Sequence, residues 1–345
     1  MCKIFFVFLY LVSLLLYAVT PNVYSYEINA LAGILLVISI VLYFKIKRVS
    51  NIFCFDTLFL LAFCITFFVY PIFLYPINPK YFALLSYPFN EDVITRATVL
   101  SLVGANSYMF GNLMFKQKNV YQQPIASFSK KIPDLKIFVL LLYVSFAAFV
   151  ALGGITYYKD LYQGNENNSS TLFGYFNIIV RSCVIISIAI QFIRLKKTDC
   201  KVSNNRISKS LFLFIALYSV LILSTGARGA ILNVWLVLIW SYTYYIRHLK
   251  LLQFVALIFA GALVLSLVGL YRGGFSVEGF RFWDLFMDLI INNRNTFVAI
   301  DYVDRNGVTY GESMLGVVLR AVPFFSGIVH NLFDLDPNKT VSSMI

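Results

Sequence analysis

Charged residues are scarce in this sequence. Of its 345 residues only 13% are charged, whereas 60% are hydrophobic and 17% are aromatic. A soluble domain carries about a quarter of its residues as charged side chains, which cover its surface, and a soluble chain of this length would need enough of them for two domains. The composition therefore excludes a soluble protein and predicts a membrane protein that crosses the bilayer several times.

Cysteine and histidine are also few, which limits disulfide and metal chemistry. The five cysteines form no Cys-x-x-Cys pair, and the sequence has two histidines, His248 and His330, so neither a disulfide framework nor a multi-histidine metal centre is expected. Basic residues outnumber acidic ones by 28 to 16. Because the excess falls in short clusters between apolar runs, it predicts an orientation in the membrane rather than a nucleic-acid partner.

Nine apolar stretches are long enough to cross a bilayer as helices. A spanning helix needs about 20 mostly apolar residues, and a backbone inside lipid must form its own hydrogen bonds, which favours helices. The predicted spans are residues 3–19, 28–44, 56–75, 93–115, 135–152, 173–194, 210–224, 229–246 and 251–271. No small-residue cleavage site precedes Pro21, so the first span is expected to be retained. The predicted fold class is all-α and polytopic, with about nine transmembrane helices and room for a tenth.

Basic side chains divide the links between spans into two groups. The links after the second, fourth, sixth and eighth spans, together with Lys3, hold 17 basic residues, the opposite side holds ten, and Arg181 lies within the sixth span. Links rich in lysine and arginine stay on the cytoplasmic side. We therefore predict a cytoplasmic amino terminus, a transmembrane bundle over 1–271 and a large outer loop over 272–345.

The outer segment 272–345 is expected to fold onto the membrane region. Aromatic and aliphatic side chains recur at helical spacing between Phe280 and Ile290, which predicts an amphipathic helix over 278–305. Its aromatic side chains should be buried against the helical bundle or the outer lipid interface, because large exposed apolar patches are uncommon. A second apolar piece, 314–333, is interrupted by an arginine, a proline and a histidine, and this favours an interfacial or re-entrant helix over a tenth span.

Two arginines are flanked by glycine. Arg228 lies in Thr225-Gly-Ala-Arg-Gly-Ala230 at an expected helix start, and Arg272 precedes two glycines at an expected helix end. Guanidinium groups are planar, permanently charged and suited to phosphate, while glycine permits close approach and the amides at a helix start favour an anion. Charges near a span usually face a cavity or a partner. These residues therefore predict a diphosphate-binding site.

The same region resembles the O-antigen polymerases, the Wzy-type polymerases of oligosaccharide repeat units. The resemblance is carried by Ser224–Ala230, Tyr271–Gly274, Asn293–Asn295, Tyr310–Ser313 and an apolar run that ends at Pro323. It implies an all-helical glycosyltransferase of the bacterial inner membrane that joins undecaprenyl-diphosphate-linked repeat units into O-antigen or capsular polysaccharide. It implies a large periplasmic loop but no cofactor, nucleotide sugar or metal. The implied partners are the lipid-linked glycans, the bilayer, a chain-length regulator and a flippase.

The carboxyl terminus departs from this resemblance. Members of the family generally continue with further spanning helices after the large loop, whereas this sequence ends at Ile345, inside the loop or just beyond it. The resemblance therefore implies either a shortened member of the family or a chain truncated at its carboxyl terminus.

Glycosyl transfer needs a stabilised diphosphate leaving group and a base for the acceptor hydroxyl. Arginines supply the first requirement through preorganised charge, so we predict Arg228, Arg272 and Arg294 as catalytic residues. The predicted substrate-binding residues are Arg181, Arg281, Glu278, His330 and Trp283. By residue type, the base stays open among Glu278, Asp301, Glu312 and His330. The alternative for the outer arginines is pairing with acidic side chains of the same loop, such as Asp301 and Asp304.

Three other functions remain open on the sequence. An O-antigen ligase also combines spanning helices, arginines and a periplasmic histidine, and His330 is the single histidine of the predicted outer segment. A lipid-linked oligosaccharide flippase would have spans along its whole length and short loops, which the long segment 272–345 disfavours. A non-catalytic membrane scaffold is the third alternative.

Overall fold

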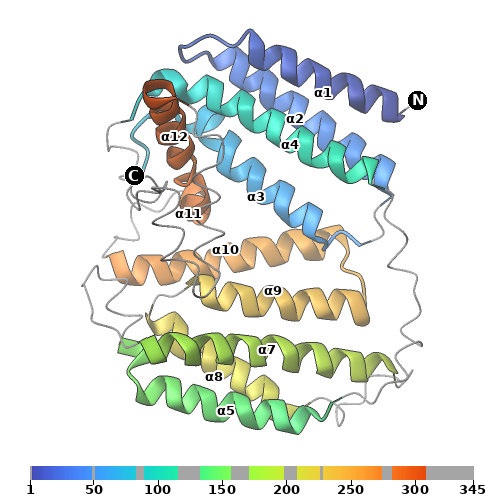
Figure 1. Cartoon of the computed structure of the whole chain (residues 1–345), viewed down its shortest axis with the longest axis vertical. Coiled ribbons are helices and arrows are strands. Elements are labelled where there is room, and N and C mark those ends of the chain that lie inside the picture. The colour runs from blue at the N-terminus through green and yellow to red at the C-terminus, as the bar shows by residue number, and fades with distance from the viewer. Residues whose placement is uncertain are drawn as a thin grey trace, which may run out of the picture. The chain divides into compact units, whose positions relative to one another are not determined.

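The described part of the chain is built from helices. The computed structural model describes residues 2–48, 51–82, 89–115, 133–156, 171–197, 208–225, 228–273 and 282–307, and no strand occurs among them (Figure 1). Its long helices are α1 (Cys2–Ala18), α2 (Tyr26–Lys47), α3 (Phe55–Val69) with its π-helical extension η1 (Tyr70–Leu74), α4 (Ile94–Met114), α5 (Leu135–Ala151), α7 (Thr171–Lys197), α8 (Lys209–Thr225), α9 (Arg228–Tyr245) and α10 (Leu251–Gly273). Each predicted span corresponds to one of these helices, so the all-α polytopic class is confirmed.

The helices differ in how readily they would cross a membrane alone. Three segments of the described chain combine sufficient length with an apolar composition, namely Tyr26–Lys47, Phe55–Leu74 and Tyr175–Leu195. Shorter apolar stretches of the described chain lie within α1, α5, α8, α9 and α10.

The structure groups the chain into two compact units. Unit 1 comprises residues 1–49, 58–116 and 286–345, and unit 2 comprises residues 50–57 and 117–285. Unit 1 thus contains α1, α2, most of α3, α4 and a helix from the carboxyl-terminal segment, α12 (Asn293–Asn306). Unit 2 contains α5 and α7 to α10.

In unit 1, α2 and α4 run in the same direction. The backbone N–H of Ser25, just before α2, donates to Oγ1 of Thr95 at 2.9 Å. At the other end of both helices, Nζ of Lys47 donates to Oδ1 of Asn112 at 3.3 Å. The parallel arrangement follows from α3, which carries the chain back between them.

The packing surface of α4 combines small and polar side chains with apolar ones. Its buried residues include Ala97, Thr98, Ser101, Ala105 and Asn106. The hydroxyls of Thr98 and Ser101 donate to the carbonyls of Ile94 and Ala97 one turn earlier, at 2.9 and 2.8 Å. Small residues allow helices in a membrane to approach closely. A helix as polar as α4 can therefore be placed in the bundle because it packs against both α1 and α2.

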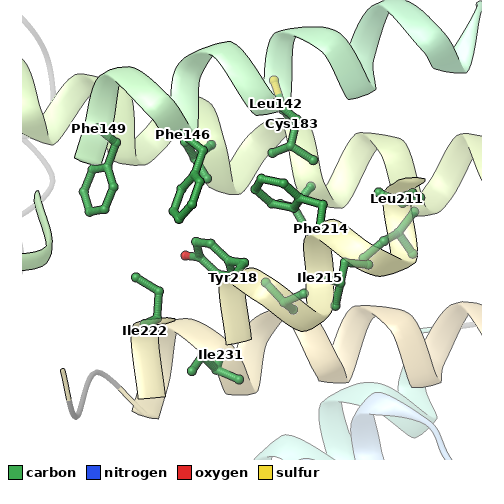
Figure 2. Close-up of a cluster of buried hydrophobic side chains, with 14 of the residues drawn as sticks. Leu142, Phe146, Phe149, Cys183, Leu211, Phe214, Ile215, Tyr218, Ile222 and Ile231 are labelled. Carbon is green, nitrogen blue, oxygen red and sulfur yellow. The ribbon is translucent and has the colours of Figure 1, made fainter. Parts of the chain in front are cut away.

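In unit 2, aromatic side chains form the core between α5, α7, α8 and α9. Figure 2 shows the rings of Phe146, Phe214 and Tyr218 turned toward one another across the helices. The centroid of Phe146 lies 5.3 Å from that of Phe214 and 5.6 Å from that of Tyr218, with both pairs edge to face. Edge-to-face contact is the preferred geometry for such pairs, so ring shape fixes how these helices meet.

The carboxyl-terminal segment is less regular than expected. The prediction of one amphipathic helix over 278–305 is wrong for the described residues, which form a 3-10 turn (Phe282–Phe286), the short helix α11 (Met287–Ile290) and then α12. Nδ2 of Asn292 donates to the carbonyl oxygen of Asp288 at 2.7 Å. A side-chain amide that binds a nearby backbone carbonyl competes with the helical hydrogen bonds, and the helix is interrupted at this point.

Candidate functional site

The arginine of the glycine-flanked motif occupies the predicted position. Helix α8 ends at Thr225 and α9 begins at Arg228, so the junction falls within Ser224–Ala230; Gly226 and Ala227 lie outside the described residues. The first amide groups of a helix have no intrahelical partner and carry the positive end of the helix dipole. The start of α9 therefore combines an arginine with the backbone groups that favour an anion.

The second glycine-flanked arginine lies at the end of a helix in the same unit. Arg272 is the penultimate residue of α10. A short link, 246–250, joins α9 to α10, and the two helices run in opposite directions (Figure 1). The start of α9 and the end of α10 therefore lie at the same end of unit 2. The directions of the Arg228 and Arg272 side chains are outside the described part of the structure.

Arg181 lies deeper in unit 2. The backbone N–H of Ser208 donates to Oε1 of Gln191 at 3.3 Å, which fixes the register between α8 and the antiparallel α7. Arg181 precedes Gln191 by ten residues and Tyr218 follows Ser208 by ten, so these two side chains are at the same level. Nε of Arg181 is buried. Ten residues separate Arg181 from the first residue of α7, which corresponds to about 15 Å along the helix at a rise of 1.5 Å per residue.

The third predicted catalytic arginine lies on α12, which packs against unit 1. Nε of Arg294 is buried. Phe297, one turn later, is fully buried, with its ring stacked on that of Phe89 at a centroid distance of 5.2 Å and lying 6.0 Å from that of Tyr70. The prediction that the aromatic side chains of this segment are buried is confirmed for Phe297. Phe282, whose side chain is 54% exposed, is not buried by the described part of the protein, and its burial at the outer lipid interface stays a prediction.

Acidic side chains of α12 bind polar groups at the start of α4. Arg96 of α4 forms a bidentate pair with Asp304, at 2.7 and 3.0 Å. Asn90 donates to Oδ1 of Asp301 at 3.1 Å, while Oδ2 of Asp301 pairs with Arg305 at 2.7 Å. Both carboxylate oxygens of Asp301 are thus engaged, which weakens its claim to act as the base. For Arg305, the alternative of pairing within the loop is confirmed.

A group of tyrosines lies at the same end of unit 1. The hydroxyl of Tyr75 donates to Oε2 of Glu91 at 2.6 Å, and the ring of Tyr75 lies 4.3 Å from that of Tyr24. Tyr24 in turn donates to the carbonyl oxygen of Pro71 at 2.9 Å. Burial raises the pKa of Tyr24, so its hydroxyl stays a donor.

Several predicted residues are placed only in part or not at all. Trp283 is half-buried, with its ring 5.1 Å from that of the neighbouring Phe282. The predicted residues outside the described part of the chain are Glu278, Arg281, Glu312 and His330. Among the described residues, no three histidine, cysteine, aspartate or glutamate side chains are grouped so that they could hold a metal ion.

Arg96 and Asn90 were missed by the sequence analysis. A signal was present for Arg96, since it is a charged residue inside a predicted span, and such residues usually have a specific partner. The partner itself, Asp304, is 208 residues away in the sequence. No such signal exists for Asn90, because it precedes the predicted span and asparagine is a common residue in loops.

The apolar helices and the basic links between them define a polytopic membrane protein. The family model of the O-antigen polysaccharide polymerase Wzy matches residues 2–345. The match covers essentially the whole chain, and the chain therefore belongs to this family, as the resemblance of its motifs predicted. Neither a curated protein nor a solved structure gives a significant match.

Proposed function

We propose that this chain polymerises undecaprenyl-diphosphate-linked oligosaccharide repeat units at the periplasmic face of the inner membrane. Membership of the polymerase family carries the proposal in general terms. The finer statement is supported by one observation above others: Arg228 and Arg272 lie at one end of unit 2, at a helix start and a helix end. Two such residues suit a diphosphate, whose charge is spread over two phosphoryl groups.

The orientation is supported by the distribution of charge within unit 1. Lys45, Lys47 and Arg48 lie at the carboxyl end of α2. Lys47 there contacts Asn112, which is near the carboxyl end of α4. The contacts of α12 are with the opposite end of α4, at Arg96. If the lysine-rich end faces the cytoplasm, as basic links do, α12 and the amino-terminal ends of α2 and α4 face the periplasm.

In the proposed reaction, a hydroxyl of one repeat unit attacks the anomeric carbon of another. The bond from that carbon to the lipid diphosphate breaks, and the electron pair leaves with the diphosphate oxygen. Arg228, Arg272 and the amides at the start of α9 would stabilise this developing charge, because they are in place before the bond breaks. Arg294 is the third proposed arginine, and Arg181 and Arg281 are proposed to bind the substrate. The hydroxyl proton passes to a base, for which Glu278, Glu312 and His330 are the better candidates now that Asp301 is paired.

The proposed partners follow from the substrate. A flippase would supply the lipid-linked repeat units to the periplasmic face, and a chain-length regulator would set how many are joined. Both act beside the polymerase in the same bilayer.

Removing the chain from its host tests the proposal. Surface polysaccharide resolved on a gel should change from a ladder to a single repeat unit. Loss of all repeat units would favour a ligase or a flippase instead, and an unchanged ladder would favour a scaffold.

Variants of the two arginines test the site. Arg228→Ala and Arg272→Ala should each lower polymer formation about a hundredfold, the effect of removing one preorganised charge stabiliser, with normal abundance in the membrane. Lysine keeps the charge but loses the planar fork, so Arg228→Lys and Arg272→Lys should retain part of the activity. A stable alanine variant with a wild-type ladder would remove that arginine from the site.

Labelling tests the orientation separately. In a variant without the native cysteines, Ser276→Cys should react with an impermeant maleimide in cells whose outer membrane is permeabilised. His248→Cys, in a predicted cytoplasmic link, is the matched control and should react only after lysis. The reverse pattern would contradict the topology.

A further inference from the structure

Helix α12 contacts the other segments of unit 1 along one face. Asn293, Phe297, Asp301 and Asp304 are spaced by four, four and three residues, which places them on the same side of a helix. All four make contacts with residues of unit 1 that lie some 200 positions earlier in the chain. These contacts extend over almost the whole length of α12, so both ends of the helix are held.

The contacts differ in what they fix. Phe297 supplies buried apolar surface, which is non-directional. The two N–H groups of Arg96 bind the two oxygens of Asp304 in the fork geometry that specifies both distance and orientation. Asn90 uses both ends of its amide, since Oδ1 accepts from the backbone N–H of Asp92 at 3.1 Å while Nδ2 donates to Asp301. The polar contacts therefore determine the rotation and the register of α12.

We propose that Arg96 is a positioning residue, which acts through Asp304 to hold α12 in the register that keeps Arg294 against unit 1. Arg96 and Asp304 are partly shielded, with 24% and 37% of their side chains exposed. Arg294 lies ten residues before Asp304, about 15 Å along a rigid helix, and its Nε is buried. Loss of the Arg96 pair therefore displaces Arg294 without any contact between the two arginines. The role of Arg294 in polymerisation rests on the proposed function; the docking of α12 does not.

A direct role of Arg96 in binding the diphosphate is the competing explanation. The two differ in their response to charge reversal. If Arg96 acts through Asp304, exchanging the two charges preserves the attraction and restores function. If Arg96 binds phosphate, an aspartate at that position repels the ligand and the exchange makes the defect worse.

Crosslinking measures the docking of α12 without reference to activity. In membranes that contain the full chain without its native cysteines, the pair Asn90→Cys and Asp301→Cys should be joined by a short thiol crosslinker, because the Asn90 and Asp301 side chains are in contact. Adding Arg96→Ala should lower the yield roughly two- to fivefold, the range expected for a partly exposed ion pair. Adding Arg96→Asp together with Asp304→Arg should restore it. Arg305→Ala is the matched control, because Arg305 is 71% exposed and its ion-pair partner, Asp301, is already replaced in this background, so the yield should be unchanged.

The same changes, in a chain that keeps Asn90 and Asp301, are then tested on the polysaccharide ladder. Arg96→Ala should shorten the ladder, the exchanged pair should restore it, and Arg305→Ala should leave it unchanged. Failure of the exchanged pair to restore crosslinking overturns the proposal. So does a ladder that is unaffected when crosslinking is lost. If Arg228→Ala leaves the ladder intact, the proposed function fails, while the crosslinking result on α12 still stands.

Discussion

The helices α4 of unit 1 and α8 of unit 2 bury different kinds of side chain. The buried face of α4 is largely alanine, serine, threonine and asparagine, whereas that of α8 is formed mainly by leucine, isoleucine, phenylalanine and tyrosine. Lipid tails are as apolar as leucine, so helices in a membrane associate through close packing and hydrogen bonds rather than through the exclusion of water. In unit 1, small buried side chains of α4 and polar contacts such as that of Ser25 with Thr95 lie between the helices. In unit 2 a polar contact, Ser208 with Gln191, is accompanied by large aromatic rings in the core.

The largest effect is expected where a ring is removed from unit 2. Phe214 is fully buried among Phe146, Tyr143 and Tyr218. Phe214→Ala should lower the free energy of unfolding by about 3–5 kcal/mol, because the cavity adds to the lost burial. The thermal midpoint of the purified protein in detergent measures this. The neighbouring Leu213, 68% exposed, provides the control. An equal loss of stability in Leu213→Ala would show that the aromatic core of unit 2 does not carry the effect.

A smaller effect is expected from added volume. A Cβ atom at Gly154 in unit 2 would overlap the ring of Phe149, whereas a Cβ atom at Gly104 of α4 would meet no atom within 4 Å. Gly154→Ala should therefore destabilise by about 1–3 kcal/mol through overpacking. Gly104→Ala should be neutral or slightly stabilising, because alanine is the better helix former by about 1 kcal/mol. Equal thermal midpoints for the two variants would show that the Phe149 ring moves aside to accommodate the added methyl group.

The smallest effect is expected at a buried amide of unit 1. Neither polar atom of the Asn106 side chain has a hydrogen-bond partner in the described part of the chain. In Asn29 only Oδ1 lacks one, since Nδ2 donates to Thr95 at 3.4 Å. Asn106→Leu should stabilise the protein by about 1 kcal/mol, since an unpaired buried amide costs free energy. Asn29→Leu should destabilise it by a similar amount. Loss of stability in Asn106→Leu would mean that this amide has a partner, such as a bound water molecule.

Hydropathy predicts the long helices well because a spanning helix is specified by its own residues. The break between α8 and α9 was also predictable, since glycine on both sides of Arg228 marks it locally. The pairing of Arg96 with Asp304 was not, because each residue has several acceptable partners and only the folded chain selects one. Asn292 shows the same limit at short range: an amide tolerated within a predicted helix instead binds the carbonyl of Asp288 and interrupts it.

The division of unit 1 along the chain has a consequence for the order of assembly. Its helices α1 to α4 are synthesised first, and α12 follows only after α5 to α10. During that interval the surface formed by Tyr70 and Phe89 lacks Phe297. Domains generally fold as units during synthesis, but here unit 2 is made before unit 1 can be completed. Slow insertion of unit 2 would therefore extend the lifetime of an incomplete unit 1, so a defect within α5 to α10 would be detected as proteolysis of α1 to α4 in newly made chains.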